Sequence, residues 1–261
     1  MIGDNFYEDG VDSVESERFK LTFEDAFKRD FPNYADMKFY VIAGNHDYYG
    51  NMTAQIEYTK KQDRWKFDSL WYKLEHIFDD FSVDILMIDT PSLHDEHSTD
   101  EVDCPDQEHC NSEVRKNEQK AWIAEQLESS VADYLIVVGH HPVFSSCEEG
   151  VTYQLVEWLY PLLVKHKVGL YLSGHKHNQE FLDDKNSDVK FAVSGTGHKP
   201  NKQDEKDRKK KGELPENINL QWFWNDRDSD GAYVHLDITK ENLKLDYILA
   251  DDESVQFSEQ D

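Results

Sequence analysis

The sequence is short of basic residues, cysteine and long apolar runs. Lysine and arginine number 28 against 54 aspartate and glutamate residues, which gives a formal net charge of −26. A surface with this charge repels nucleic acid and anionic membranes, which argues against binding to a duplex. It also repels phosphate esters at long range. A site for such esters therefore needs local positive charge, and bound metal ions are its strongest source.

No stretch is apolar enough and long enough to span a membrane, and no signal peptide opens the chain. Cys104 and Cys110 lie six residues apart in a polar stretch, and Cys147 stands apart. They allow either three unrelated thiols or a Cys104–Cys110 loop disulfide with Cys147 left free. Asn51-Met52-Thr53 is an N-glycosylation sequon, which favours secretion only slightly.

The 261 residues are 38% hydrophobic and 13% aromatic, which is typical of a globular chain with a large core. There is no internal repeat and no sign of a second domain, so residues 1–261 are expected to form one domain. Apolar periodicity predicts helices at 13–30, 112–130 and 152–166, the last interrupted by Pro161.

Strands are predicted at 38–43, 83–89, 134–138, 168–172 and 190–193, and a closing hairpin at 231–238 and 243–249. Residues 92–111 are interpreted as a long loop, and 199–216, with its Lys-Arg run, as a solvated loop. Strands and helices alternate in the middle and paired strands close the chain. This pattern indicates a layered α/β sandwich.

Four short polar motifs each follow an apolar run or the start of the chain. They are Gly3-Asp4-Asn5-Phe6-Tyr7, Gly44-Asn45-His46-Asp47, Gly139-His140-His141-Pro142 and Gly174-His175-Lys176-His177. Strand ends are where α/β proteins place their sites. Hard oxygen ligands mixed with imidazoles suit iron, zinc or manganese better than calcium. The motifs therefore predict a dinuclear metal centre.

His175 and His177 are two residues apart, so in extended backbone both imidazoles point to the same side. His140 follows Gly139 as His175 follows Gly174, which favours it as a ligand, although His141 is an alternative. Asp47 is a candidate to orient the ring of the neighbouring His46. Each histidine alone is equally compatible with a buried, hydrogen-bonded structural role.

Asp4 and Tyr7 form the strongest local pair. A carboxylate at a strand end can bridge two metals. Tyrosine must lose a proton with a pKa near 10 to become a ligand, and a trivalent metal can drive that loss. Tyr7 therefore suggests iron(III), although a packed aromatic is the simpler explanation for any single tyrosine.

These motifs resemble those of the purple acid phosphatases, and closely those of the tartrate-resistant, mammalian-type branch of the calcineurin-like metallophosphatases. The similarity covers nearly the whole chain and includes Gly50-Asn51 through Gln55 to Arg64-Trp65, and Ser194-Gly195-Thr196-Gly197. It implies a four-layer αββα sandwich. It also implies hydrolysis of phosphate monoesters, small or on proteins, by metal-activated water.

The resemblance also implies roles for individual residues. Asp4 would bridge both metals, and Tyr7 and His177 would bind iron(III). The second metal, a divalent iron, zinc or manganese ion, would be held by Asn45, His140 and His175. His46 would contact the phosphate or protonate the leaving group, and loop 92–111 would lie where this branch carries a regulatory loop.

The family's first motif, an Asp-x-Gly after the first strand, has no counterpart before Asp4. We therefore expect a sandwich that lacks its first strand, a truncated chain, and a lost signal peptide of a secreted or lysosomal protein. A monomer with no nucleic-acid partner and no membrane span is expected. A non-catalytic truncated fragment and a phosphodiesterase of the same superfamily stay open as alternatives.

Overall fold

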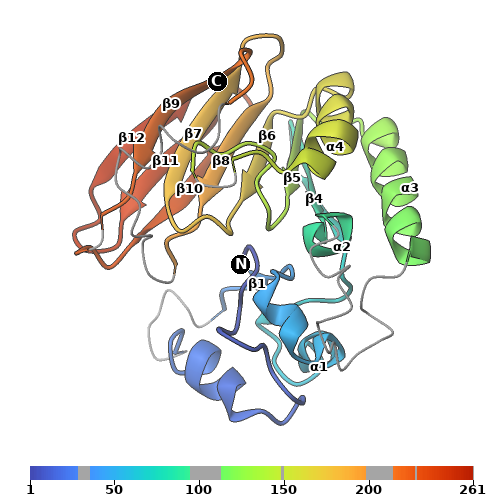
Figure 1. The fold of residues 1–261 in the computed structure, drawn as a ribbon, viewed down its shortest axis with the longest axis vertical. Helices are drawn as coiled ribbons and strands as arrows, with labels where there is room; N and C mark the ends of the chain where they lie inside the picture. Colours follow the sequence, from blue (N-terminus) through green and yellow to red (C-terminus); the bar gives the residue numbers. More distant parts are fainter. Residues whose placement is uncertain (29–35, 95–112, 148–149, 198–213, 227, 261) are drawn as a thin grey trace.

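The computed structural model describes residues 1–28, 36–94, 113–147, 150–197, 214–226 and 228–260. In this part of the chain a seven-stranded mixed sheet, a three-stranded sheet and a two-stranded sheet are formed (Figure 1). The large sheet contains, in spatial order, β3 (Tyr72–Ile77), β4 (Ser82–Met87), β5 (Tyr134–Val138), β6 (Leu170–Ser173), β8 (Lys190–Ser194), β7 (Gln179–Asp184) and β9 (Ile218–Trp224). The smaller sheets contain β10 (Ala232–Ile238), β11 (Leu243–Leu249) and β12 (Val255–Gln260), and β1 (Phe39–Tyr40) and β2 (Trp65–Lys66).

The centre of the large sheet is parallel, and this places the functional loops. Strands β4, β5, β6 and β8 run parallel, whereas β3, β7 and β9 join them antiparallel. The carboxyl ends of parallel strands meet at one edge, where α/β sheets bind their ligands. The loops that follow β4, β5 and β6 therefore converge.

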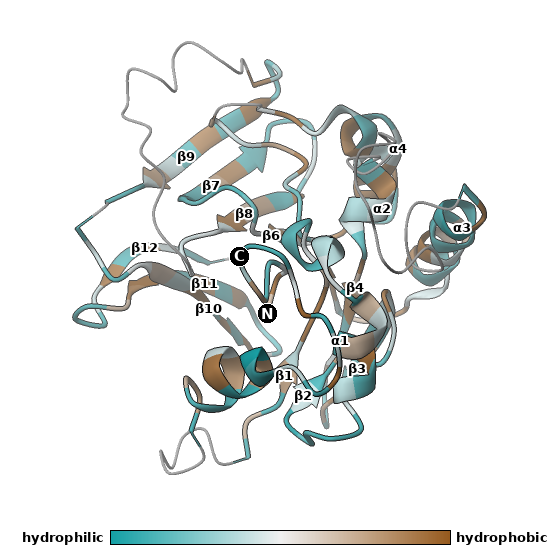
Figure 2. Cartoon of the chain, turned by 60° about the horizontal axis from the view of Figure 1, so that its bottom comes forward, coloured by the Kyte–Doolittle hydropathy of each residue, from teal (hydrophilic) through white to brown (hydrophobic). Residues whose placement is uncertain are grey.

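Alternation along β5 divides the core in two. Leu135 and Val137 belong to the cluster that the helices cover, whereas Ile136 and Val138 belong to the cluster shared with the three-stranded sheet. Because successive side chains on a strand point to opposite faces, one strand supplies both layers. Along the edge strand β9, by contrast, apolar and polar positions alternate in the first half of the strand (Figure 2).

Helices cover one face of the large sheet (Figure 1). They are α2 (Thr90–His94), α3 (Glu113–Ser129) and α4 (Tyr153–Lys165), while α1 (Met52–Tyr58) lies in the N-terminal region. Leu155, Leu159 and Leu163 lie at four-residue spacing on α4 and are fully buried against the sheet. The three-stranded sheet packs on the opposite face.

An aromatic cluster supports the N-terminal motif. Phe6 packs edge-on against Phe19 with ring centroids 5.0 Å apart, and Trp65 lies 5.8 Å from Phe6. Phe19 stacks on Tyr58 of α1 at 3.8 Å. This packing anchors the loop that carries Asp4 to the segment around α1.

The predicted mixed α/β fold is confirmed, and several elements fall where the apolar runs placed them. Strand β5 occupies the predicted residues, β10 and β11 form the predicted antiparallel hairpin, and α3 and α4 lie within one residue of their predicted ends. Pro161 lies inside α4 without ending it.

Other predictions were wrong. The helix expected at 13–30 is shorter than predicted: residues 17–24 are helical, and Phe19–Glu24 form a π-helical segment that buries Phe19 and Phe23 in the aromatic cluster. The apolar face predicted for the helix at 112–130 contains Ala121, Trp122 and Leu127, but Ala121 is exposed, and Gln119 and Ile123 are buried with Leu127. Residues 92–94 of the predicted loop belong to α2. The rest of that loop, with Cys104 and Cys110, lies outside the described residues, as do residues 198–213.

Among the residues that the structure describes, no helix has the length and apolarity needed to cross a membrane.

A buried carboxyl ties β4 to the rest of the molecule. Asp89 is fully buried, its Oδ2 accepts a hydrogen bond from the Tyr48 hydroxyl (2.6 Å), and its backbone N–H donates to Gln119 Oε1 (2.8 Å). Burial raises the pKa of Asp89 to about 6, although the Tyr48 hydrogen bond partly offsets this effect.

We expect Asp89→Asn to change how stability depends on pH. The pKa of Asp89 is higher in the folded protein than the value of 3.8 in the unfolded chain, so the folded state binds the carboxyl proton more tightly. This proton binding stabilises the folded wild type at low pH, and the stabilisation is lost as the pH rises through about 6. Relative to the variant, the wild-type free energy of unfolding should fall by up to about 3 kcal/mol between pH 4 and 7. Urea titrations across this range measure the difference. The exposed Asp68→Asn is the control, and parallel curves for wild type and Asp89→Asn would contradict the assignment.

Candidate metal centre

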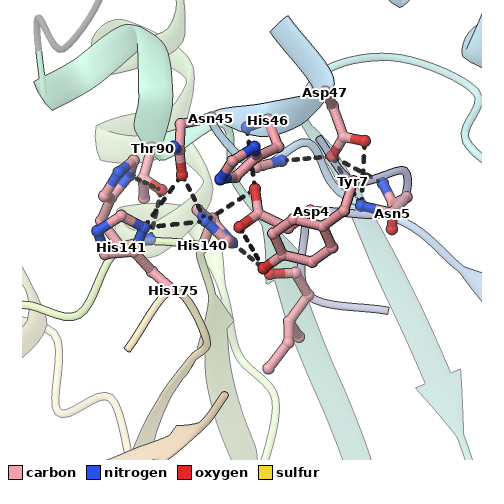
Figure 3. A network of polar contacts seen from close by, with 12 residues as sticks. Asp4, Asn5, Tyr7, Asn45, His46, Asp47, Thr90, His140, His141 and His175 are labelled. Carbon is pink, nitrogen blue, oxygen red and sulfur yellow. Dashed lines mark hydrogen bonds and ion pairs between the residues drawn. The ribbon is translucent and has the colours of Figure 1, made fainter. Parts of the chain in front are cut away.

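The four polar motifs converge at the edge of the large sheet where the central parallel strands end (Figure 3). His140 follows β5 and His175 follows β6. Ile2 pairs with Ile42 in a parallel bridge, so the segments leading to Asp4 and Asn45 run side by side. Residues from four distant stretches of sequence thus meet in one place.

The backbone at this edge adopts unusual conformations. Asp4 and His175 have φ values of 52° and 62°, in the left-handed region that is sparsely populated by residues other than glycine. Gly44 is required by close approach, because a Cβ there would lie 2.2 Å from the Asp4 backbone nitrogen. Such strain gathers at functional sites, where surrounding structure holds it in place.

One group of donor atoms comprises Asn45 Oδ1, His140 Nε2 and His175 Nδ1. The amide oxygen lies 3.1 Å from the His140 nitrogen and 3.0 Å from the His175 nitrogen, and the two nitrogens are 3.3 Å apart. Ligand atoms held about 2.0–2.1 Å from one metal lie about 2.9–3.4 Å from one another. The three atoms therefore have the spacing of ligands that share a metal ion.

A second group comprises Asp4 Oδ2, the Tyr7 hydroxyl and His177 Nε2. The hydroxyl lies 2.7 Å from the carboxylate oxygen and 3.0 Å from the imidazole nitrogen. The side chains of Tyr7 and His177 meet although they are 170 residues apart in sequence. A phenol, a carboxylate and an imidazole suit iron better than a softer metal.

The Asp4 carboxylate connects the two groups. Its Oδ1 lies 3.3 Å from His140 Nε2 and accepts the backbone N–H of His46 (3.0 Å), while its Oδ2 faces Tyr7. One oxygen therefore faces each group, which is the arrangement that a bridging ligand requires.

Hydrogen bonds behind the site orient two imidazoles. His140 Nδ1 lies 2.8 Å from the Ile2 carbonyl oxygen, so it carries the proton and leaves Nε2 directed at the donor group. His46 Nδ1 lies 2.7 Å from the Glu8 carbonyl oxygen, which in the same way directs its Nε2 away from the backbone.

The expectation that Asp47 orients His46 was wrong. The fully buried Asp47 carboxylate instead accepts backbone N–H groups of Gly44 (2.8 Å) and Asn5 (3.0 Å), and the Gln55 side-chain amide (3.0 Å). Burial raises the pKa of Asp47, and these donors offset part of the shift. Asp47 thereby ties the loop that carries Asp4 to the loop that carries Asn45.

The charges of the two groups complement one another. Burial alone would raise the pKa of Asp4, but the neighbouring His140 and hydrogen bonds from Tyr7 and a backbone N–H outweigh it, so this pKa lies well below its usual value. Burial lowers the pKa of His175, and nearby imidazoles lower it further. The carboxylate is therefore ionised and His175 is neutral, which are the forms that bind metals.

Tyr7 behaves in the opposite way. Burial and the Asp4 carboxylate both raise its pKa above the usual value. The phenol is thus protonated without a metal, and only a strongly charged ion would favour its deprotonation.

Comparison with known proteins identifies the family to which the chain belongs. The family model for calcineurin-like phosphoesterases matches residues 1–179. The chain belongs to the calcineurin-like phosphoesterase family. Within this family it is related to tartrate-resistant acid phosphatase type 5. It is 37% identical to the pig protein over 97% of this chain and 72% of that protein, and 36% identical to the human protein over 97% and 76%.

Two more distant comparisons agree on the fold. Purple acid phosphatase 17 of Arabidopsis thaliana is 32% identical over 76% of this phosphoesterase and 57% of that protein. A solved structure described as GAP50, the anchor in the inner membrane complex of Plasmodium, superposes with a TM-score of 0.77 over 99% of this chain and 76% of that chain, at 22% identity. The latter similarity concerns the fold alone.

All seven residues predicted from the phosphoesterase motifs meet at one site: Asp4, Tyr7, Asn45, His46, His140, His175 and His177. Sequence reasoning missed Thr90, whose hydroxyl contacts His141, because a threonine after a strand has no distinctive signal. Asn51 Oδ1 caps α1 by accepting a hydrogen bond from the Ala54 N–H (2.9 Å). Glycosylation of Asn51 stays a prediction. Cys147 is buried, and its sulfur lies 2.6 Å from the side-chain nitrogen of Asn178.

We expect Asp47→Asn to loosen the metal centre and the fold together. The amide replaces one acceptor oxygen by a donor that faces other donors, which should cost roughly 2–4 kcal/mol of stability. Denaturant titration measures that loss, and chelator competition measures the accompanying loss of metal affinity. The exposed Asp9→Asn, which removes a charge from the same region, is the control. Equal losses in the two variants would show that charge, not the hydrogen bonds, matters.

Proposed function

We propose that this phosphoesterase is a metal-dependent acid phosphatase that hydrolyses phosphoric monoesters. The observation that carries the proposal is Asp4, whose two carboxylate oxygens face two separate groups of metal-binding atoms. The relationship to tartrate-resistant acid phosphatase type 5 supports the same activity.

The donor atoms fit a pair of different metals. Asp4, Tyr7 and His177 would hold iron(III), and Asn45, His140 and His175 with the second oxygen of Asp4 would hold a divalent iron, zinc or manganese ion. When bound, such a pair supplies positive charge for the phosphoryl oxygens and lowers the pKa of a coordinated water. This charge also offsets the repulsion of phosphate esters by the acidic surface.

The residues around the centre have distinct tasks in this proposal. His46 lies beside Tyr7 with ring centroids 4.6 Å apart, and its Nδ1 is engaged by a backbone carbonyl. Its Nε2 can therefore deliver a proton to the departing alkoxide, a contribution of about 10²–10⁴ in rate. Asp4 stays anionic in acid because of its low pKa. It could therefore still bind metal ions at the pH of an acid phosphatase.

Two alternatives make different demands on the site. A phosphodiesterase would share the histidine and asparagine ligands but has less need of Tyr7. A non-catalytic protein would bind one metal without turnover. We further propose a monomer in the exocytic pathway, secreted or lysosomal, for which the Asn51 sequon is the direct support in the sequence.

We expect the protein loaded with iron(III) to be coloured through the phenolate of Tyr7. Tyr7→Phe removes the oxygen that faces the iron group, so the visible absorption band should disappear. Tyr49→Phe is the matched control, since Tyr49 also packs near His46 (5.7 Å between ring centroids) but lies outside the donor groups. A band that survives in Tyr7→Phe would exclude this residue as the ligand.

We expect turnover of p-nitrophenyl phosphate to exceed that of bis(p-nitrophenyl) phosphate. His140→Ala should remove the second metal and lower monoester turnover by about 100-fold or more, because the water and phosphate lose one of two charges. Metal analysis and steady-state assays measure both effects, with the exposed His76→Ala as control. Near-normal turnover in His140→Ala would refute the assignment. One bound metal without turnover in wild type would support the non-catalytic alternative.

A further inference from the structure

The second histidine of Gly139-His140-His141-Pro142 lies in the metal centre, not beside it. His141 is buried, with 1% of its surface exposed. Its backbone N–H donates to Thr90 Oγ1 (2.8 Å) and its carbonyl oxygen accepts from the Tyr171 hydroxyl (2.7 Å). The backbone of His141 is thus fixed by side chains of two elements, Thr90 at the start of α2 and Tyr171 within β6.

The ring of His141 packs against His140 and His175, the two histidines of the donor group that contains Asn45. Its centroid lies 4.4 Å from that of His175 and 5.1 Å from that of His140. One ring nitrogen from each of the three histidines lies within 4.8 Å of the other two. Within the described part of the chain these form a group with the composition of a metal site.

Thr90 orients this ring. Its fully buried hydroxyl lies 3.1 Å from His141 Nδ1. A hydroxyl oxygen can accept two hydrogen bonds, so it can receive both the backbone N–H and the Nδ1–H of His141. A metal-binding histidine commonly donates its other ring N–H in this manner. With Nδ1 turned to Thr90, Nε2 is the nitrogen that we assign to the metal.

We propose that His141 supplies a third imidazole to the divalent metal held by Asn45, His140 and His175. The inference rests on the proposed metal-dependent function and adds a ligand to it. Together with the Asp4 oxygen that faces this group, three imidazoles and one amide oxygen form a nitrogen-rich donor set that suits zinc, whereas manganese prefers sites richer in oxygen. The chain would therefore select zinc at this position.

The required adjustment is small. Nitrogens that share one metal at about 2.0–2.1 Å lie within about 3.4 Å of one another in a tetrahedral site, so the His141 ring would close by at most about 1.5 Å. Its backbone stays fixed by Thr90 and Tyr171, so a side-chain rotation is enough.

Zinc binding tests the proposal without any assay of activity. The apoprotein is titrated with one equivalent of Zn²⁺, its affinity is measured by competition with a chromophoric chelator, and X-ray absorption counts the imidazoles on the zinc. We expect three imidazoles in wild type. Two would overturn the proposal, whatever the variants show.

Variants give an independent test. His141→Phe keeps a ring of similar size and should weaken zinc binding at least tenfold, and Thr90→Val should weaken it about 10–100-fold. His94→Phe is the matched control, because His94 packs on His141 (4.8 Å) but is outside the group of three. Unchanged affinity in His141→Phe would overturn the proposal. If the His141→Phe apoprotein unfolds at a lower temperature than wild type, the zinc affinity of Thr90→Val is the test instead. Unchanged affinity in Thr90→Val would then overturn the proposal.

The failure of the proposed function has a different signature. If wild type binds no Zn²⁺ at all, the metal-dependent function itself is wrong. If it binds Zn²⁺ through two imidazoles and His141→Phe matches it, only the role of His141 is wrong.

Discussion

The buried carboxylate of Asp47 is the interaction on which the metal centre depends. It lies between two loops that carry donor atoms, and it accepts backbone N–H groups from both of them. A buried charge is costly unless hydrogen bonds satisfy it, so this carboxylate is compatible only with a conformation in which both loops are in place. The positions of Asp4 and Asn45 relative to each other follow from that requirement. The aromatic packing of Phe6 and Trp65 supports the same arrangement from the apolar side.

Electrostatics explain how so acidic a chain can hold a site for an anion. The net charge of −26 is spread over the whole sequence, whereas the site gathers five imidazoles near the carboxylate of Asp4. Desolvation lowers the pKa values of His141 and His175, so these histidines add no positive charge of their own. In the proposed function, the positive potential that a phosphate needs would come from metal ions bound there. An acidic surface would then be compatible with phosphate binding, because the charge at the site would be set by the metal ions and not by the net charge of the chain.

The site could be predicted from sequence more fully than the fold around it. The four motifs follow strands or the chain start, and strand ends converge in a parallel sheet, so Asp4, Asn45, His140 and His175 could be placed together from spacing and family resemblance. The helix expected at 13–30 was predicted with the right buried side chains, Phe19 and Phe23, but too long, because periodicity locates a helix face better than it locates the ends of a helix. The role of Asp47 could not be predicted, because it depends on the backbone N–H of Asn5, which is far away in sequence.

The contact between Tyr7 and His177 closes a loop of 170 residues. Long loops cost conformational entropy that nearby contacts cannot repay, so the two ends meet only after the intervening sheet has been assembled. The metal centre is consequently a late product of folding. A chain caught at an intermediate stage offers isolated histidines and carboxylates that bind metals weakly and without discrimination. In the proposed function, the site would therefore bind its two metals only after the whole topology is complete, and a bound metal pair would mark a finished molecule.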